Sequence, residues 1–213
     1  MDKLEPTFNN FYVDSSNKYA YEFLKNITDR KNDYSIVILS GKNGVGKTHL
    51  MFALEENLKN KENVIRISSQ ELRKKLIEKI KNKTSDNLFN KLDILIIEDI
   101  QFLISIGRIE EEFYKLVKKL ARENKTLLMT IDKDKKNIKK FELIKRIMKI
   151  DKSKSVILNI KPKITNKTKI KIIQNFSTTN HINIKESEII DLIKKCNNFQ
   201  EIKNELNNRK III

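Results

Sequence analysis

An eight-residue segment, Gly-Lys-Asn-Gly-Val-Gly-Lys-Thr at residues 41–48, fills every fixed place of the phosphate-binding pattern G-x-x-x-x-G-K-[ST]. Its glycines allow backbone N–H groups to turn toward the β- and γ-phosphates of a nucleotide, and Lys47 adds a positive charge that reaches them. The hydroxyl of Thr48 is a ligand for Mg²⁺. The spacing therefore predicts a nucleoside triphosphate site that contains Gly41, Asn43, Gly44, Val45, Gly46, Lys47 and Thr48.

A second candidate feature is a pair of adjacent carboxylates, Glu98 and Asp99, directly after the apolar run Ile94–Ile97. In phosphoryl-transfer sites, one such acid completes the Mg²⁺ shell and the next orients the attacking water. We therefore expect Glu98 to hold Mg²⁺ together with Thr48, and Asp99 to act in catalysis. A solvated strand end is the alternative interpretation, which the intact phosphate loop upstream disfavours.

Five apolar runs alternate with segments of helical period: Ile36–Leu39, Val64–Ile67, Ile94–Ile97, Leu127–Thr130 and Val156–Ile160. This alternation predicts an α/β fold with a five-stranded, doubly wound parallel sheet that has helices on both faces. After Pro162 a polar stretch begins and the strand-like runs stop. We expect a domain boundary there, with a nucleotide-binding core over residues 1–162 and a small lid of three helices over residues 163–213.

The chain is basic, with 44 Lys and Arg against 28 Asp and Glu and a net charge of +16. This charge favours an anionic partner such as nucleic acid, although a general bias toward lysine, asparagine and isoleucine weakens the indication. One cysteine and two histidines cannot form a disulfide framework or a Cys/His zinc site. No apolar run approaches the roughly 20 residues that span a bilayer. We expect a cytoplasmic protein, nucleoid-associated if it binds DNA, with no membrane partner.

Three groups of residues resemble the central domain of the DnaA family of bacterial replication initiators, a family of the AAA+ class. They are the N-terminal segment from Thr7 to Tyr21, the sequence Gly-Lys-Thr-His-Leu at 46–50, and Glu-Asp-Ile-Gln-Phe-Leu at 98–103. The resemblance extends from about residue 4 to about residue 206. It implies a P-loop AAA+ module that binds ATP or ADP with Mg²⁺ and acts as a nucleotide switch in the initiation or regulation of chromosomal DNA replication.

The resemblance also implies roles for single residues outside the phosphate loop. Thr130 or Asp132, at the end of the fourth strand, would sense the γ-phosphate, and Arg146 would be an arginine finger for a neighbour's ATP. Val13 and Asn17 would lie near the adenine, and His49, directly after the phosphate-binding pattern, would belong to the same nucleotide site. The helix after the second strand would face single-stranded DNA through Arg73, Lys75, Lys79, Lys81 and Lys83. A purely structural interpretation stays open for Arg146, Val13 and Asn17, and a solvated lysine face stays open for the helix.

Two residues depart from the family pattern. Glu98 is one methylene longer than the aspartate that the family has there, and Gln200 stands where the family places a lid arginine that contacts phosphate. A neutral amide cannot replace the charge of a guanidinium, so we expect Gln200 to border the nucleotide without that charge. The expected activity is ATP binding with weak hydrolysis to ADP and phosphate.

The 213 residues contain no match to the family's helix-turn-helix domain, so we expect no sequence-specific binding of duplex DNA by this chain. The expected protein partner is a second copy or a full-length initiator. Two alternatives stay open: an Hda-like regulator that acts on a full-length initiator at the polymerase clamp, and a DnaC-like helicase-loader ATPase. The first normally carries a Gln-Leu clamp motif, and residues 1–6 contain no glutamine.

Overall fold

The computed structural model describes residues 5–28, 34–82, 89, 91–104, 106–132, 138–180 and 182–210. Its elements are α1 (Lys18–Thr28), β1 (Ile36–Gly41), α2 (Lys47–Leu58), β2 (Val64–Ser68), α3 (Ser69–Asn82), β3 (Ile94–Glu98), the 3-10 helix η1 (Ile100–Phe102), α4 (Arg108–Arg122), β4 (Thr126–Asp132), α5 (Ile138–Met148), β5 (Ser155–Asn159), α6 (Asn166–Asn180), α7 (Glu186–Lys195) and α8 (Phe199–Lys210). Within these ranges, every helix is too short or too polar to cross a membrane.

The five strands form one parallel sheet in the order β2-β3-β4-β1-β5. Every residue of β1 is buried, as expected for a central strand that is covered on both faces. In this strand order β4 lies between β1 and β3, so the phosphate loop after β1 and the carboxylates after β3 flank the end of β4 at one edge of the sheet. Ligands of open α/β sheets bind outside this carboxyl edge.

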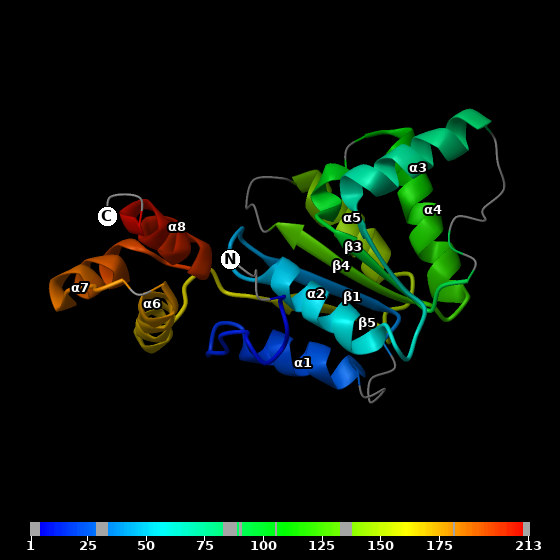
Figure 1. The fold of residues 1–213 in the computed structure, drawn as a ribbon. Coiled ribbons are helices and arrows are strands. Elements are labelled where there is room, and N and C mark those ends of the chain that lie inside the picture. Colours follow the sequence, from blue (N-terminus) through cyan, green and yellow to red (C-terminus); the bar gives the residue numbers. More distant parts are fainter. Residues whose placement is uncertain are drawn as a thin grey trace.

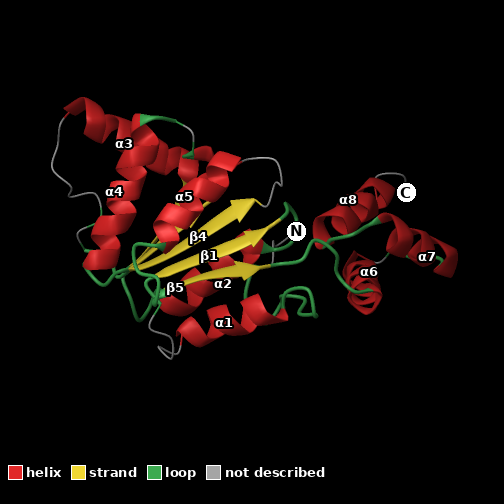
Figure 2. Cartoon of the chain, turned by 180° about the vertical axis from the view of Figure 1, so that it is seen from behind, coloured by secondary structure: helices red, strands yellow, loops and turns green. Residues whose placement is uncertain are grey.

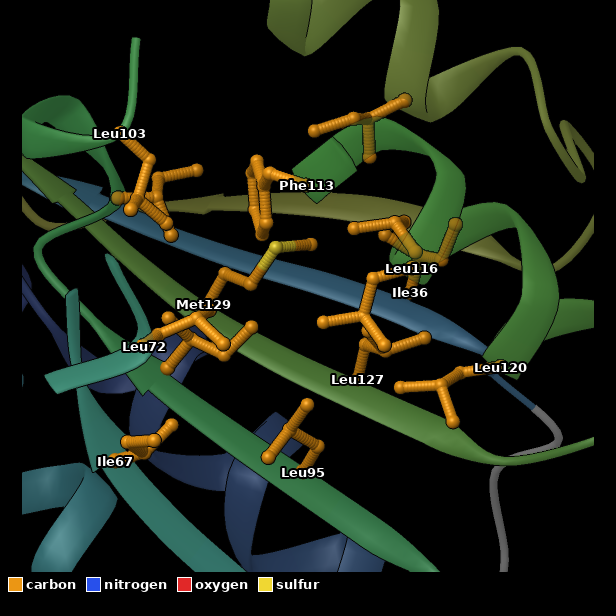
Figure 3. Close-up of a cluster of buried hydrophobic side chains, with 14 of the residues drawn as sticks. Ile36, Ile67, Leu72, Leu95, Leu103, Phe113, Leu116, Leu120, Leu127 and Met129 are labelled. Atoms are coloured by element: carbon orange, nitrogen blue, oxygen red, sulfur yellow. The ribbon is translucent and has the colours of Figure 1, made fainter. Parts of the chain in front are cut away.

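Helices α3, α4 and α5 cover one face of the sheet, and α1 and α2 cover the other (Figures 1 and 2). Successive side chains of a strand point to opposite faces, so each face has its own core. In the first core, Phe113 and Leu116 of α4 pack over Ile36, Leu127 and Met129 of the sheet (Figure 3). The predicted doubly wound α/β sheet is therefore confirmed.

Helices α6, α7 and α8 form a separate small bundle beyond the carboxyl ends of the strands (Figure 2). They share their own buried cluster, which includes Ile173, Leu192, Ile202 and Leu206. Tyr12 of the N-terminal segment packs against this cluster from outside the bundle. The predicted helical lid is confirmed, and the exact boundary at residue 162 stays a prediction.

Candidate functional site

The phosphate loop leaves β1 at Gly41 and enters α2 at Lys47 through two glycines in the left-handed region. Gly44 has φ 80° and Gly46 has φ 97°, values that cost other residues roughly 1–2 kcal/mol. Side chains from other parts of the chain also lie close to both glycines. A Cβ on Gly44 would lie 2.8 Å from Oδ1 of Asn198 in the lid, and a Cβ on Gly46 would lie 2.7 Å from Cε2 of Phe11. Glycine is therefore required at both positions by conformation and by space.

Lys47, the first residue of α2, is buried inside this loop with only 6% of its surface exposed. Its Nζ donates hydrogen bonds to the carbonyl oxygens of Gly41 at 2.8 Å and Lys42 at 3.0 Å. Burial lowers the pKa of its ammonium below the ordinary 10.5, against the negative charges of Asp132 and Asp99. The loop thus holds a cation that is poorly solvated, a favourable partner for phosphate oxygens.

A cavity of about 310 Å³ opens beside the phosphate loop, between the core and the lid. This volume is within the range of small-ligand sites, roughly 300–1,000 Å³. Its lining combines polar side chains, among them Lys47, Thr48 and Asp99, with aromatic and apolar ones. The lining residues are Asn43, Gly44, Val45, Gly46, Lys47, Thr48, His49 and Asp99 of the core, Asn10, Phe11, Tyr12 and Asn17 of the N-terminal segment, and Ile164, Thr168, Ile172, Phe199 and Gln200 of the lid.

The N-terminal segment, residues 5–17, crosses between the core and the lid. Phe11 stacks on Tyr21 and presents an edge to the ring of His49 at 5.1 Å. Tyr12 lies 6.0 Å from the ring of Phe199 and accepts a hydrogen bond from Asn175 in the lid. The segment thus brings aromatic side chains to both sides of the cavity.

Asn17 and Val13 of this segment, the two candidates for contact with adenine, differ in their position relative to the cavity. Asn17 is buried and lines the cavity, and its amide holds the segment through bonds to Tyr12 O and Asp14 N. Val13 is 40% exposed and lies in a neighbouring groove between the segment and α6. Their contact with adenine stays a prediction.

His49 anchors the start of α2 to the N-terminal segment. Its Nε2 lies 2.9 Å from the carbonyl oxygen of Thr7, so the neutral ring donates its Nε2 proton there. Burial lowers the pKa of His49, while the bond to Thr7 raises it, and the net shift is downward from 6.5. The ring is therefore neutral at pH 7 and adds no charge to the phosphate end of the cavity.

The two adjacent acids diverge. The carboxylate of Glu98 binds Arg66 of β2 at 2.5 Å, and Arg66 also binds Glu55 of α2. Asp99 instead lines the cavity together with Thr48. Hydroxyl and carboxylate oxygens are the ligands that Mg²⁺ prefers, and the assignment of this ion to Thr48 and Glu98 stays a prediction. The bond to Arg66 engages Oε1 of Glu98.

Thr130 and Asp132 both lie on β4, next to the acids. The hydroxyl of buried Thr130 accepts a hydrogen bond from the backbone N–H of Asp99 at 2.8 Å. The backbone N–H of Asp132 donates to Oε1 of Gln101 at 3.1 Å, and the charge of Asp132 acts on Lys47. Thr130 thus supports the end of β3. Asp132 carries a negative charge that acts on Lys47 of the phosphate loop.

Gln200 lines the cavity from the first turn of α8, and its amide donates to Oδ1 of Asn204 at 2.8 Å. Asn198 caps the same helix, because its Oδ1 accepts from the backbone N–H of Glu201 at 3.0 Å. The start of α8 therefore touches Gly44 of the phosphate loop through neutral groups.

Arg146 lies on α5, outside the cavity lining. Its guanidinium binds both carboxylate oxygens of Glu111 on α4, at 3.1 and 3.4 Å, and lies 4.4 Å from the ring centre of Tyr114. The pair is exposed, with 43% of the Arg146 side chain in solvent. A finger role for Arg146 requires a second subunit and stays a prediction.

The basic residues of α3 differ in their exposure to solvent. Arg73 and Lys81 are exposed, and Lys75 is partly exposed. Lys79 is bound to Glu112 of α4 at 2.8 Å. Lys83 lies outside the described residues. Contact of this helix with single-stranded DNA stays a prediction.

Sequence reasoning did not assign a role to four residues that build this site: Phe11, Arg66, Gln101 and Asn198. Gln101 and Phe11 stand within segments that carried the family resemblance, which was the available signal. Arg66 and Asn198 act through contacts that no local pattern marks. These residues position the acids, the phosphate loop and the lid.

The parallel sheet, the phosphate loop after β1, the acidic end of β3 and the helical lid define a P-loop domain of the AAA+ class. A comparison with family models gives the particular family: residues 3–150 match the bacterial DnaA ATPase domain. The chain belongs to this family.

Known relatives agree with this assignment. The chromosomal replication initiator protein DnaA of Helicobacter hepaticus is 36% identical over 192 residues, which is 88% of this chain and 41% of that protein. This chain thus spans about two fifths of the length of that relative. Domain III of the Thermotoga maritima replication initiation protein DnaA has a TM-score of 0.78, 21% identity, and coverage of 95% of this chain and 86% of that one. Replication initiator DnaA bound to AMPPCP and single-stranded DNA has a TM-score of 0.78, 24% identity, and coverage of 97% and 65%. At these identities the two structures support the fold.

Proposed function

We propose that this domain binds ATP or ADP with Mg²⁺ in the cavity between its core and its lid. The observation that carries the proposal is the buried Lys47 ammonium within a loop of left-handed glycines that lines that cavity. A triphosphate would place its charge against Lys47 and the backbone N–H groups of the loop. Thr48 and Glu98 would hold Mg²⁺, and Asp99 would orient the attacking water. The adenine would lie beside the aromatic side chains of Phe11 and Tyr12.

Hydrolysis by the isolated domain is proposed to be weak. Glu98 is longer than the aspartate of the family pattern, and its Oε1 is bound to Arg66, which restrains its approach to the metal. From the lid, Gln200 lines the cavity with a neutral amide bound to Asn204, at the place where the resemblance to the family puts an arginine that would stabilise phosphate. Both features leave the binding of the triphosphate intact while they reduce stabilisation of the transition state.

The output of binding is proposed to be a change in assembly, in the initiation or regulation of chromosomal replication in the cytoplasm. A nucleotide in the cavity would touch the phosphate loop, the N-terminal segment and α8 together, so its presence would change how the lid lies on the core. The proposed partner is another copy of this domain or a full-length initiator. The exposed basic residues Arg73 and Lys81 of α3 support a salt-sensitive contact with single-stranded DNA.

Calorimetry with Mg²⁺·ATP and Mg²⁺·ADP tests the binding step. We expect saturable heat from both nucleotides, and no heat at millimolar ligand would refute the proposal. Phosphate release is then measured for the protein alone, with single-stranded DNA, and with a full-length initiator. Binding without turnover supports a switch, turnover that needs the initiator supports an Hda-like regulator, and turnover in the protein alone or with DNA supports a loader-type ATPase.

A further inference from the structure

The side chain of Gln101, in the 3-10 helix η1, connects the ends of β3 and β4. Its Nε2 donates to Oδ1 of Asp99 at 3.1 Å, and its Oε1 accepts from the backbone N–H of Asp132 at 3.1 Å. A backbone N–H can only donate, and an ionised carboxylate can only accept. The amide of Gln101 therefore has one orientation that satisfies both neighbours.

Asp99 has an unusual backbone conformation, with φ 58° and ψ 50°. For a residue other than glycine, the left-handed region costs roughly 1–2 kcal/mol and persists only where the surroundings hold it. Among the hydrogen bonds that hold Asp99, its backbone N–H donates to Thr130, and its carboxylate accepts from Gln101. The first bond fixes the backbone of Asp99, and the second fixes the direction of the carboxylate that lines the cavity.

We propose that Gln101 is a positioning residue for ATP hydrolysis, which acts through the carboxylate of Asp99; this inference rests on the proposed function. Gln101 is not among the residues that line the cavity, so its effect on bound nucleotide is indirect. The bond from its Nε2 leaves the second oxygen of Asp99 to accept a hydrogen bond from the attacking water.

In the hydrolysis step, the water oxygen bonds to the γ-phosphorus and the bond from this phosphorus to the bridging oxygen of ADP breaks. One water proton stays on the phosphate product, and the other passes to solvent. A carboxylate that is misdirected by about 1 Å can slow such a step by about a hundredfold. Binding of the triphosphate depends mainly on the loop and Lys47, so the effect of Gln101 on the hydrolysis rate should be separable from any effect on ATP affinity.

Two substitutions test the two hydrogen bonds of the Gln101 amide. Gln101→Glu keeps an oxygen for the N–H of Asp132 but replaces the donor to Asp99 with a second negative charge. Gln101→Met has a similar size and removes both bonds. Gln174→Glu is the matched control, because Gln174 is exposed on α6 and lies outside the cavity lining. Thermal unfolding followed by circular dichroism establishes that each variant is folded.

The measurements are the single-turnover hydrolysis rate and the dissociation constant for Mg²⁺·ATP. We expect both Gln101 variants to hydrolyse at least tenfold more slowly, with dissociation constants within threefold of the unaltered protein. A wild-type rate in Gln101→Glu would overturn the inference, as would a parallel loss of rate, affinity and thermal stability. ATP binding without any hydrolysis in the unaltered protein would also overturn it and leave the proposed binding function standing, whereas absence of binding would remove the proposed function itself.

Discussion

Replacement of Lys47 by methionine should separate nucleotide binding from folding. Charge-assisted hydrogen bonds contribute about 1.5–3 kcal/mol each, and about 1.4 kcal/mol corresponds to tenfold in affinity. Loss of the ammonium should therefore weaken ATP binding by roughly ten- to hundredfold, or more where Lys47 contacts two phosphates. The free energy of unfolding should change little. Met loses the two bonds to the carbonyls of Gly41 and Lys42, but it also removes a buried charge, which burial disfavours.

Lys42→Met is the matched control, since it makes the same change five positions earlier in the same loop. The side chain of Lys42 is exposed, and only its carbonyl faces Lys47. ATP affinity is measured by calorimetry, and the free energy of unfolding is measured by urea titration, where a change below about 1 kcal/mol is expected for both variants. Equal ATP affinity in Lys47→Met and the unaltered protein would refute the reasoning. So would an equal loss of affinity in Lys42→Met.

Three other substitutions test the cap of the lid helix α8, the connection of the lid to the core through Asp14, and the proposed contact of Arg146 with a second subunit. Asn198→Ala should lower the free energy of unfolding by about 1 kcal/mol in urea titration, because α8 loses its cap, and Asn198→Gly should cost a few tenths. Burial acts to raise the pKa of Asp14, but hydrogen bonds from Ser16 and Thr165 outweigh it, and the pKa lies below 3.8. The contribution of ionised Asp14 to the free energy of unfolding should be complete above pH 3.8 and disappear as the pH falls below this value. A curve of the free energy of unfolding against pH should lack this contribution in Asp14→Asn. Arg146→Ala should keep ATP affinity and remove any turnover that depends on self-association, and unchanged turnover in phosphate-release assays would exclude the finger role.

Hydrophobic periodicity predicted most of the architecture. Phe113, Leu116, Val117 and Leu120 recur at helical spacing, and the structure buries all of them on α4. The five apolar runs became the five strands of a parallel sheet, because strands buried on both faces need continuous apolar sequence. The order of the strands was not predictable in this way, since apolar runs carry no information about which run is the neighbour.

The fine geometry of the site was less accessible from sequence. The motif placed Glu98 and Asp99 together, but the direction of each side chain depends on partners distant in the chain. Arg66 binds Glu98 from 32 residues away, and Gln101 binds the backbone of Asp132 from 31 residues away. A pattern of residue types identifies the two acids, whereas only the fold shows which acid lies in the cavity.

Two unfavourable features of the described residues lie at the carboxyl edge of the sheet. Asp99 has a left-handed backbone, and Lys47 is buried with a lowered pKa. The apolar cores on the two sheet faces supply burial that offsets such costs, since a fully buried large apolar side chain contributes about 1.5–3 kcal/mol. Bound Mg²⁺·ATP would neutralise the charge of Lys47 and add contacts between Gly44 and the lid. The domain should therefore become more stable with nucleotide, and this gain should be lost in Lys47→Met.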